Sequence, residues 1–216
     1  MVFNSNFTSF DFTALYKMTY LESVDMMEVT GLPVLTNVVM LGLKNLSRLS
    51  IYHTDIKFDY NTFQNLKRLK YLSISKVDVA ILGNEVFNGS MLEELYWTDS
   101  GIEKIDRYCF SPLGNIKIIN LSGNKLAYLW PESFIGLRRL ERLYLNRNRL
   151  ATMNFRQLEH LPSLQYLDIS MNKFPMIRLD EVTRNSPNLT TIVVDKKSVE
   201  KEQIANSNSR LRIVFV

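Results

Sequence analysis

The sequence contains few of the residues on which enzymes and disulfide-bonded domains depend. Cys109 is the only cysteine among 216 residues, so no disulfide framework and no cysteine-based metal site can form within the chain. There are two histidines, His53 and His160, which fall in different repeats of the pattern described below, and the pattern places no serine or cysteine nucleophile beside either. No G-x-x-x-x-G-K-[ST] motif occurs, which excludes a P-loop. The sequence therefore predicts neither catalysis nor a cofactor.

Long apolar runs and a one-sided charge are also missing. No run of 18 apolar residues exists, so no transmembrane helix is encoded in this chain. The first residues, MVFNSNFTSFDF, lack the basic and apolar regions of a signal peptide, and if the natural protein is secreted we expect this chain to be a fragment. The 26 basic residues are interspersed among 22 acidic ones, which does not favour nucleic acid as a partner.

What the sequence has in abundance is one repeated pattern, L-x-x-L-x-L-x-x-N-x-L. Close matches begin at Ile116, Leu140 and Leu164. Looser matches begin at Leu46, Leu69, Leu92 and Leu189. The spacings between successive starts are 23, 23, 24, 24, 24 and 25, and 22 more residues lead to Leu211. We predict a single domain over 1–216, with a partial repeat in 1–20, a degenerate repeat in 21–45, seven repeats in 46–210 and a truncated repeat in 211–216.

Each repeat predicts a short strand that must bury its apolar face against its neighbours. Alternate residues of the L-x-L segment point inward, so neighbouring strands stack in parallel around one core. A second apolar column is expected about 18 residues into each repeat, on the opposite side of the core: Phe63, Phe87, Phe110, Phe134 and Leu158. Trp97 occupies an inward leucine position, and Cys109 precedes a phenylalanine of this column, so we expect both to be buried.

The asparagine of the pattern occurs in three repeats, as Asn124, Asn148 and Asn172. An inward asparagine can satisfy backbone groups where the chain leaves the strand, and leaving such groups unpaired costs about 1–3 kcal/mol each. Thr54 and Ser100 are expected to substitute in part. The remaining repeats have Val29, Val77 and Lys197 at this position, and the valines cannot substitute. We therefore expect a regular centre from about 92 to 180 and a looser N-terminal third.

The run IKIINLSGNKLAYLWPESFIGLRRLERLYLNRNRL resembles the extracellular class of animal leucine-rich repeat proteins, and Pro131, Phe134 and Leu137 match its P-x-x-x-F-x-x-L tail. The resemblance implies an α/β-type solenoid, a right-handed horseshoe with a parallel β-sheet on the concave face and irregular or short helical segments on the convex side. Receptor ectodomains, adhesion proteins and secreted innate-immunity factors have this architecture. The loose repeats and aromatic-rich loops look most similar to arthropod members. Cysteine-rich caps usual in the class are absent, which also favours a fragment.

Outward positions of the predicted strands form the candidate binding surface. Tyrosine and arginine are enriched in protein-binding hot spots. The candidates are Tyr52, His53, Tyr71, Glu94, Tyr96, Asp99, Arg142, Tyr144, Arg147, Tyr166 and Asp168. The alternative is that they only cover a hydrophilic sheet face. The N-terminal strands lean acidic and the region of Arg142, Arg147 and Arg149 leans basic, which is suited to steering an acidic partner or is simply a solvated face.

Five N-x-[ST] sequons are candidate glycosylation sites, at Asn6, Asn45, Asn88, Asn120 and Asn188. The predicted function is non-enzymatic recognition of a protein partner on the concave face, outside the cell or at its surface, with a role in innate immunity or cell-surface signalling. Two alternatives stay open. One is an intracellular, cytoplasmic adaptor or scaffold that uses the same face, and the other is an architectural spacer.

Overall fold

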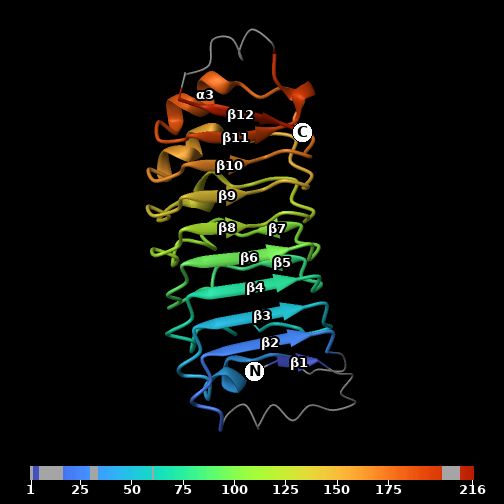
Figure 1. The fold of residues 1–216 in the computed structure, drawn as a ribbon, viewed down its shortest axis with the longest axis vertical. Coiled ribbons are helices and arrows are strands. Elements are labelled where there is room, and N and C mark those ends of the chain that lie inside the picture. The colour runs from blue at the N-terminus through green and yellow to red at the C-terminus, as the bar shows by residue number, and fades with distance from the viewer. Residues whose placement is uncertain (1, 5–16, 30–33, 60, 201–209) are drawn as a thin grey trace.

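The computed structural model describes residues 2–4, 17–29, 34–59, 61–200 and 210–216. Its main feature is one parallel sheet of ten strands in the order β1-β2-β3-β4-β6-β8-β9-β10-β11-β12. The strands are β1 (Val2–Asn4), β2 (Ser23–Met27), β3 (Arg48–Tyr52), β4 (Tyr71–Ser75), β6 (Glu94–Thr98), β8 (Ile118–Asn120), β9 (Arg142–Tyr144), β10 (Tyr166–Asp168), β11 (Thr191–Val194) and β12 (Arg212–Phe215). They stack along the longest axis of the molecule, one strand per turn of the chain (Figure 1).

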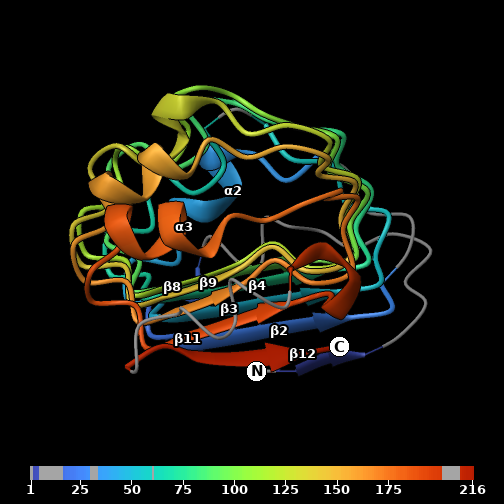
Figure 2. The ribbon, with the colours of Figure 1, turned by 90° about the horizontal axis from the view of Figure 1, so that it is seen from above.

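The side of the solenoid opposite the sheet is built from short helical segments. These are α2 (Asn37–Met40), α3 (Leu179–Asn185) and the 3-10 helices η1 (Pro131–Phe134) and η2 (Phe155–His160). A further 3-10 helix, η3 (Lys196–Ser198), directly follows β11 where the chain leaves the sheet. Figure 2 shows the large sheet along one side and α2 and α3 on the other. A small second sheet pairs β5 (Ile81–Leu82) with β7 (Lys104–Ile105). The predicted solenoid, with a parallel sheet on one face and short helical segments on the other, is confirmed.

The core lies between the sheet and the convex segments. The predicted second column is confirmed, because Phe63, Phe87, Phe110, Phe134 and Leu158 are all buried. The inward position of Trp97 and the burial of Cys109 are likewise confirmed. Burial raises the pKa of the Cys109 thiol well above its usual range, so it remains protonated and unreactive.

A residue in the left-handed conformation follows each strand from β2 to β10 of the large sheet, one to three residues after the strand ends. The residues with φ between 49° and 71° at this point are Glu28, His53, Lys76, Asp99, Gly123, Arg147 and Met171. Non-glycine residues adopt this conformation at a cost of about 1–2 kcal/mol each. Three of the predicted strand-face residues, His53, Asp99 and Arg147, therefore lie on the turn at the rim of the sheet and not on a strand.

The three asparagines join consecutive repeats through their side chains. The amide of Asn148 donates to the carbonyl oxygens of Leu121 (2.9 Å) and Leu145 (3.0 Å), and its Oδ1 accepts from the amide of Leu126 (3.0 Å). Asn124 and Asn172 make the equivalent contacts one repeat before and one repeat after. Each side chain thus satisfies backbone groups of its own repeat and of the preceding one.

The residues that replace asparagine at this position of the other repeats differ in their hydrogen bonds. Ser100 acts as predicted, since its Oγ accepts from the amide of Val77 (3.3 Å) and donates to the carbonyl of Thr98 (2.7 Å). The prediction for Thr54 is wrong, because its buried Oγ1 has no hydrogen-bond partner. Lys197 is exposed, and the buried polar side chain of that repeat is Ser198, which donates to the carbonyl of Phe174 (2.8 Å).

Candidate binding surface on the concave face

The candidate surface is the outer face of the large sheet. Along β3, Leu49 and Ile51 are buried whereas Arg48, Ser50 and Tyr52 are exposed or half-buried, as the alternation of a strand requires. Parallel register places the equivalent residues of neighbouring strands side by side. Tyr71 thus lies between Arg48 and Glu94.

The first tyrosine pair lies on β4 and β6. The rings of Tyr71 and Tyr96 are 5.4 Å apart, and the guanidinium carbon of Arg48 lies 3.8 Å from the centre of the Tyr71 ring. The hydroxyl of Tyr96 donates to Oε2 of Glu94 at 3.0 Å. Burial, and then this hydrogen bond, raise the pKa of Tyr96 to about 12, so its hydroxyl stays protonated at physiological pH.

The second pair lies on β9 and β10, where the rings of Tyr144 and Tyr166 are 5.0 Å apart. Arg142 is in register with Tyr166. Burial is the main cause that raises the pKa of Tyr166. Strand β8 separates the two pairs, and its outward residues are Ile118 and Asn120. The centre of the face is therefore two aromatic pairs on either side of a strip with smaller side chains.

Tyr52, His53, Asp99 and Arg147 each contact another side chain of the chain. Lys76 donates to the hydroxyl of Tyr52 (2.7 Å), and its ammonium nitrogen lies 5.0 Å from the centre of that ring. At the rim, a guanidinium nitrogen of Arg147 lies 3.9 Å from Oδ1 of Asp99, two repeats away. His53 is exposed and its ring lies edge-on to Tyr52, with the ring centres 6.0 Å apart.

Asp168 differs from the remaining candidates because only 9% of it is exposed. Its Oδ1 accepts from the backbone amide (3.0 Å) and the hydroxyl (2.7 Å) of Ser170. Burial raises the pKa of this carboxyl, while the two hydrogen bonds oppose that shift. The carboxylate is thus engaged by its own turn and is not available to a partner.

The sequence pattern does not reveal two contacts that shape this face, Arg48 on Tyr71 and Lys76 on Tyr52. The two residues of each pair are one repeat apart in the sequence, at 23 and 24 residues. In a protein with a fixed repeat, residues separated by one repeat are neighbours on adjacent strands. Both contacts could therefore have been predicted by comparing outward residues between neighbouring strands.

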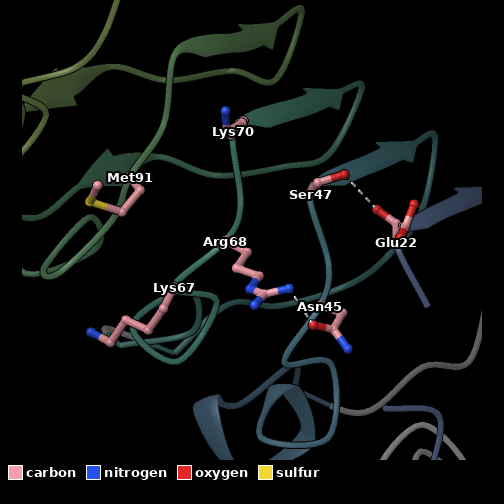
Figure 3. Close-up of a pocket in the computed structure, with 7 residues that line it drawn as sticks. All are labelled: Glu22, Asn45, Ser47, Lys67, Arg68, Lys70 and Met91. Carbon is pink, nitrogen blue, oxygen red and sulfur yellow. Dashed lines mark hydrogen bonds between the residues drawn. The ribbon is translucent and has the colours of Figure 1, made fainter. Parts of the chain in front are cut away.

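The glycosylation candidates differ in how far their amides are engaged. Asn45 is half-buried in a groove at the other end of the strands, where its Nδ2 donates to the carbonyl of Thr19 (2.8 Å) and its Oδ1 accepts from Arg68 (2.8 Å; Figure 3). Asn188 donates to the carbonyl of Pro162 (2.8 Å). Asn120 is half-buried and its Oδ1 accepts from Ser122, whereas Asn88 is exposed. Asn6 lies outside the described residues.

Two further features of the described residues bear on the site. No cluster of three or more histidine, cysteine, aspartate or glutamate side chains positioned to hold a metal ion occurs among them. None of their helices has the length and apolar character needed to cross a membrane.

Comparison with known proteins gives results consistent with this geometry. The leucine rich repeat family model matches residues 90–150 and 129–174. Toll-like receptor 3 of Boselaphus tragocamelus is 29% identical over 191 residues, which is 85% of this chain and 21% of the receptor, so the chain spans about a fifth of that protein.

Two solved structures have the same fold. The complex of TLR13 with the RNA ssRNA13 matches with a TM-score of 0.75 and 24% identity, over 85% of this chain and 30% of the matched chain. A chain of the octameric complex of latrophilin 3, Unc5D and FLRT2 matches with a TM-score of 0.68 and 18% identity, over 94% of this chain and 78% of the matched chain. These two likenesses concern the fold alone. The chain contains leucine-rich repeats, and it resembles the extracellular animal members of that family.

Proposed function

We propose that this chain is the ligand-recognition part of a non-enzymatic extracellular or cell-surface protein, and that it binds a protein partner through the two tyrosine pairs of its concave face. The observation that carries the proposal is the pairing of Tyr71 with Tyr96 and of Tyr144 with Tyr166, each flanked by an arginine. Tyrosine and arginine supply large contact areas at low entropic cost and dominate protein-binding hot spots.

The charges of the face support a protein partner over a nucleic acid. Nucleic acid binding depends on a continuous row of basic side chains along the phosphate backbone. Here Glu94 lies between Arg48 and Arg142 along one row of the sheet, Asp25 lies in another row, and Arg147 is paired with Asp99. One neighbour in fold is a complex with RNA, but the described residues of this face form no continuous row of basic side chains.

The test is a binding screen against a panel of secreted and cell-surface proteins. A partner is accepted when Tyr96→Ala/Tyr144→Ala weakens its binding at least tenfold. The matched control is Tyr108→Ala/Tyr128→Ala, which removes two exposed tyrosines outside the concave strands and is expected to leave the affinity within twofold. If a partner bound the wild type and both double variants equally, the concave face would be excluded as its site.

The extracellular location rests on the receptor relatives and has its own test. We expect the protein from animal cells to carry a glycan on Asn88, since its side chain is exposed, and none on Asn120, where a glycan would cover the strip between the tyrosine pairs. Intact mass before and after peptide N-glycanase, followed by peptide mapping, locates the modified residues. An unmodified protein recovered from the cytosol would instead favour an intracellular adaptor, and a protein without any partner would favour a spacer.

A further inference from the structure

A groove lies where the chain enters β3, β4 and β6, at the opposite end of these strands from the turns with positive φ (Figure 3). Its volume is about 500 Å³. Lys67, Arg68 and Lys70 line it together with Glu22, and Met91 is the one apolar residue among its lining side chains. The groove therefore offers positive charge and hydrogen bonds, and little apolar area.

The groove lies beside a repeat that is one residue short. Six residues lead from the convex Phe63 to Leu69, but only five lead from Phe87 to Leu92. The next two repeats again have six. The shorter segment presents one side chain fewer toward Lys67, which leaves the groove open on that side.

Two arginines of this edge are held by asparagine side chains of the preceding repeat. Nη1 of Arg68 donates to Oδ1 of Asn45 (2.8 Å), and Nη1 of Arg139 donates to Oδ1 of Asn115 (3.1 Å). A neutral amide orients a guanidinium without cancelling its charge, and the other N–H donors of the fork remain for a ligand. Both arginines are therefore positioned to bind an anion.

The positive charge of this edge is not balanced by carboxylates. Glu93 forms ion pairs with Lys70 and Lys117, at 3.0 Å each. Five further basic side chains just before the strands are exposed and form no ion pair in the described part of the chain; we call them the basic edge, and they are Lys44, Lys67, Arg68, Arg138 and Arg139.

The basic edge extends over several repeats. Arg68 precedes β4 and Arg139 precedes β9, and these strands are three steps apart in the sheet. Neighbouring strands lie about 4.8 Å apart, so the two arginines are separated by roughly 14 Å. A single sulfate or phosphate group cannot reach both, whereas a chain with repeated anionic groups can.

The side chains around the groove favour a polysaccharide among such chains. A single-stranded nucleic acid binds by stacking its bases on aromatic side chains, and none of the described residues lining the groove is aromatic. An acidic peptide brings apolar side chains, for which the groove offers only Met91. A sulfated polysaccharide brings sulfate groups for the basic edge, and hydroxyl groups that can donate to Oδ1 of Asn45 and Oγ of Ser47.

We propose that the basic edge binds a sulfated polysaccharide, with Lys67 and Arg68 in the groove holding one stretch of the chain and Arg138 and Arg139 holding another. This surface is separate from the tyrosine pairs of the concave face, and the proposal goes beyond the function proposed for them.

The test measures binding to immobilised heparin and to the same polymer after chemical desulfation. The chain is produced in bacteria, so that no glycan on Asn45 covers the groove. We expect saturable binding to heparin that weakens as the salt concentration rises, and binding to the desulfated polymer that is at least about tenfold weaker. Absence of saturable binding, equal affinity for both polymers, or tighter binding to single-stranded RNA than to heparin would overturn the proposal.

Two double variants locate the site. Arg68→Gln/Arg139→Gln removes two charges, keeps polar side chains beside Asn45 and Asn115, and should weaken heparin binding about tenfold. The matched control Arg149→Gln/Arg156→Gln removes two exposed charges elsewhere on the solenoid and should leave the affinity within about twofold. Equal weakening by both would show that only net charge matters and would contradict the proposal.

Two further variants separate this site from others. Lys67→Gln/Arg138→Gln takes the place of the first double variant if that does not fold, with the same expected loss. Tyr96→Ala/Tyr144→Ala should bind heparin as the wild type does, since the tyrosine pairs are not part of the basic edge. A loss of heparin binding in this variant would place the polysaccharide on the concave face and overturn the proposal.

Discussion

The repeats before and after β8 join their strands in different ways. Strands β2, β3, β4 and β6 have five residues each, whereas β8, β9 and β10 have three. The change occurs at β6, which pairs with β4 over five positions and with β8 over three. The first buried asparagine, Asn124, comes at the same point and donates to the carbonyl of Trp97 (2.7 Å).

The difference concerns the backbone groups at the point where a strand leaves the sheet. A strand that leaves its sheet exposes carbonyl and amide groups that must find partners. Before β8 the regular strand continues for two more residues, and a buried valine such as Val29 or Val77 follows it at the turn. After β8 the regular strand is shorter, although backbone bonds to the next repeat continue, for example from the amide of Gly123 to the carbonyl of Asn146 (3.0 Å). In this region the asparagine side chain adds bonds to carbonyls of two repeats. The N-terminal strands are thus longer, and the expected looser N-terminal third is not found in them.

Replacement of Asn148 by the valine of the N-terminal repeats should have the largest effect on stability. It leaves the carbonyls of Leu121 and Leu145 and the amide of Leu126 without the side-chain partner described above, at about 1–3 kcal/mol for each buried group. We expect Asn148→Val to lower the free energy of unfolding by about 3–5 kcal/mol in urea denaturation. The control Asn146→Val, at a half-buried position of the same turn, should change it by less than about 0.5 kcal/mol. A similar small loss for both would remove the distinction between the two regions.

The residues with positive φ that follow the strands in both regions predict a second, smaller effect on stability. Gly123 is the one glycine among them, and a Cβ there would meet the side chain of Asp99. Gly123→Ala should cost about 1–2 kcal/mol, and Asp99→Ala in the same chain should recover part of that loss. Gly114→Ala is the matched control, because no atom lies within 4 Å of its added Cβ, and it should cost less than about 0.5 kcal/mol. Additive effects of Gly123→Ala and Asp99→Ala would show that the carboxylate plays no part.

The repeat period allowed the solenoid, the inward residues and the convex phenylalanine column to be predicted, because one unit defines the environment of all others. The period does not report backbone dihedral angles. Consequently His53, Asp99 and Arg147 were assigned to strands although each lies on a left-handed turn. Nor does it report local hydrogen bonds, so Asp168 was predicted as a surface residue although Ser170 holds it in the turn.

Asp168 provides a pH-dependent comparison between two equivalent turns. Asn120 accepts the same two hydrogen bonds from Ser122 that Asp168 accepts from Ser170, so Asp168→Asn keeps the geometry and removes the buried charge. The pKa of Asp168 is raised in the folded state, so wild-type stability falls as pH rises from the unfolded pKa of about 3.9 through the folded pKa. We expect Asp168→Asn to be about 1 kcal/mol more stable at pH 7 and equal to the wild type below about pH 3.

This variant requires bacterial expression, because the substitution Asp168→Asn creates an N-x-[ST] sequon with the following Ile169 and Ser170. Urea denaturation at a series of pH values measures the difference. An advantage of the asparagine variant that did not change with pH would exclude the carboxyl group as its cause.

Thr54 should give the smallest effect, with the opposite sign to most core substitutions. Its buried Oγ1 has no partner, so Thr54→Val should raise the free energy of unfolding by about 0.5 kcal/mol. Ser100→Ala removes an acceptor used by the amide of Val77 and should lower it by about 1 kcal/mol. Differential scanning calorimetry of the two variants compares a satisfied with an unsatisfied hydroxyl at the same position of the repeat. A loss of stability in Thr54→Val would show that its hydroxyl has a partner in solution.

The central claim, that the tyrosine-paired concave face is the ligand surface, is tested most directly by site-specific photo-crosslinking. A benzophenone amino acid at Ser73, which is in register with Tyr96, faces the proposed ligand, and the same amino acid at Ile135 faces away from it on the convex side. With a partner identified in the screen, we predict a crosslinked adduct from position 73 and none from position 135. An adduct from position 135 alone would contradict the account.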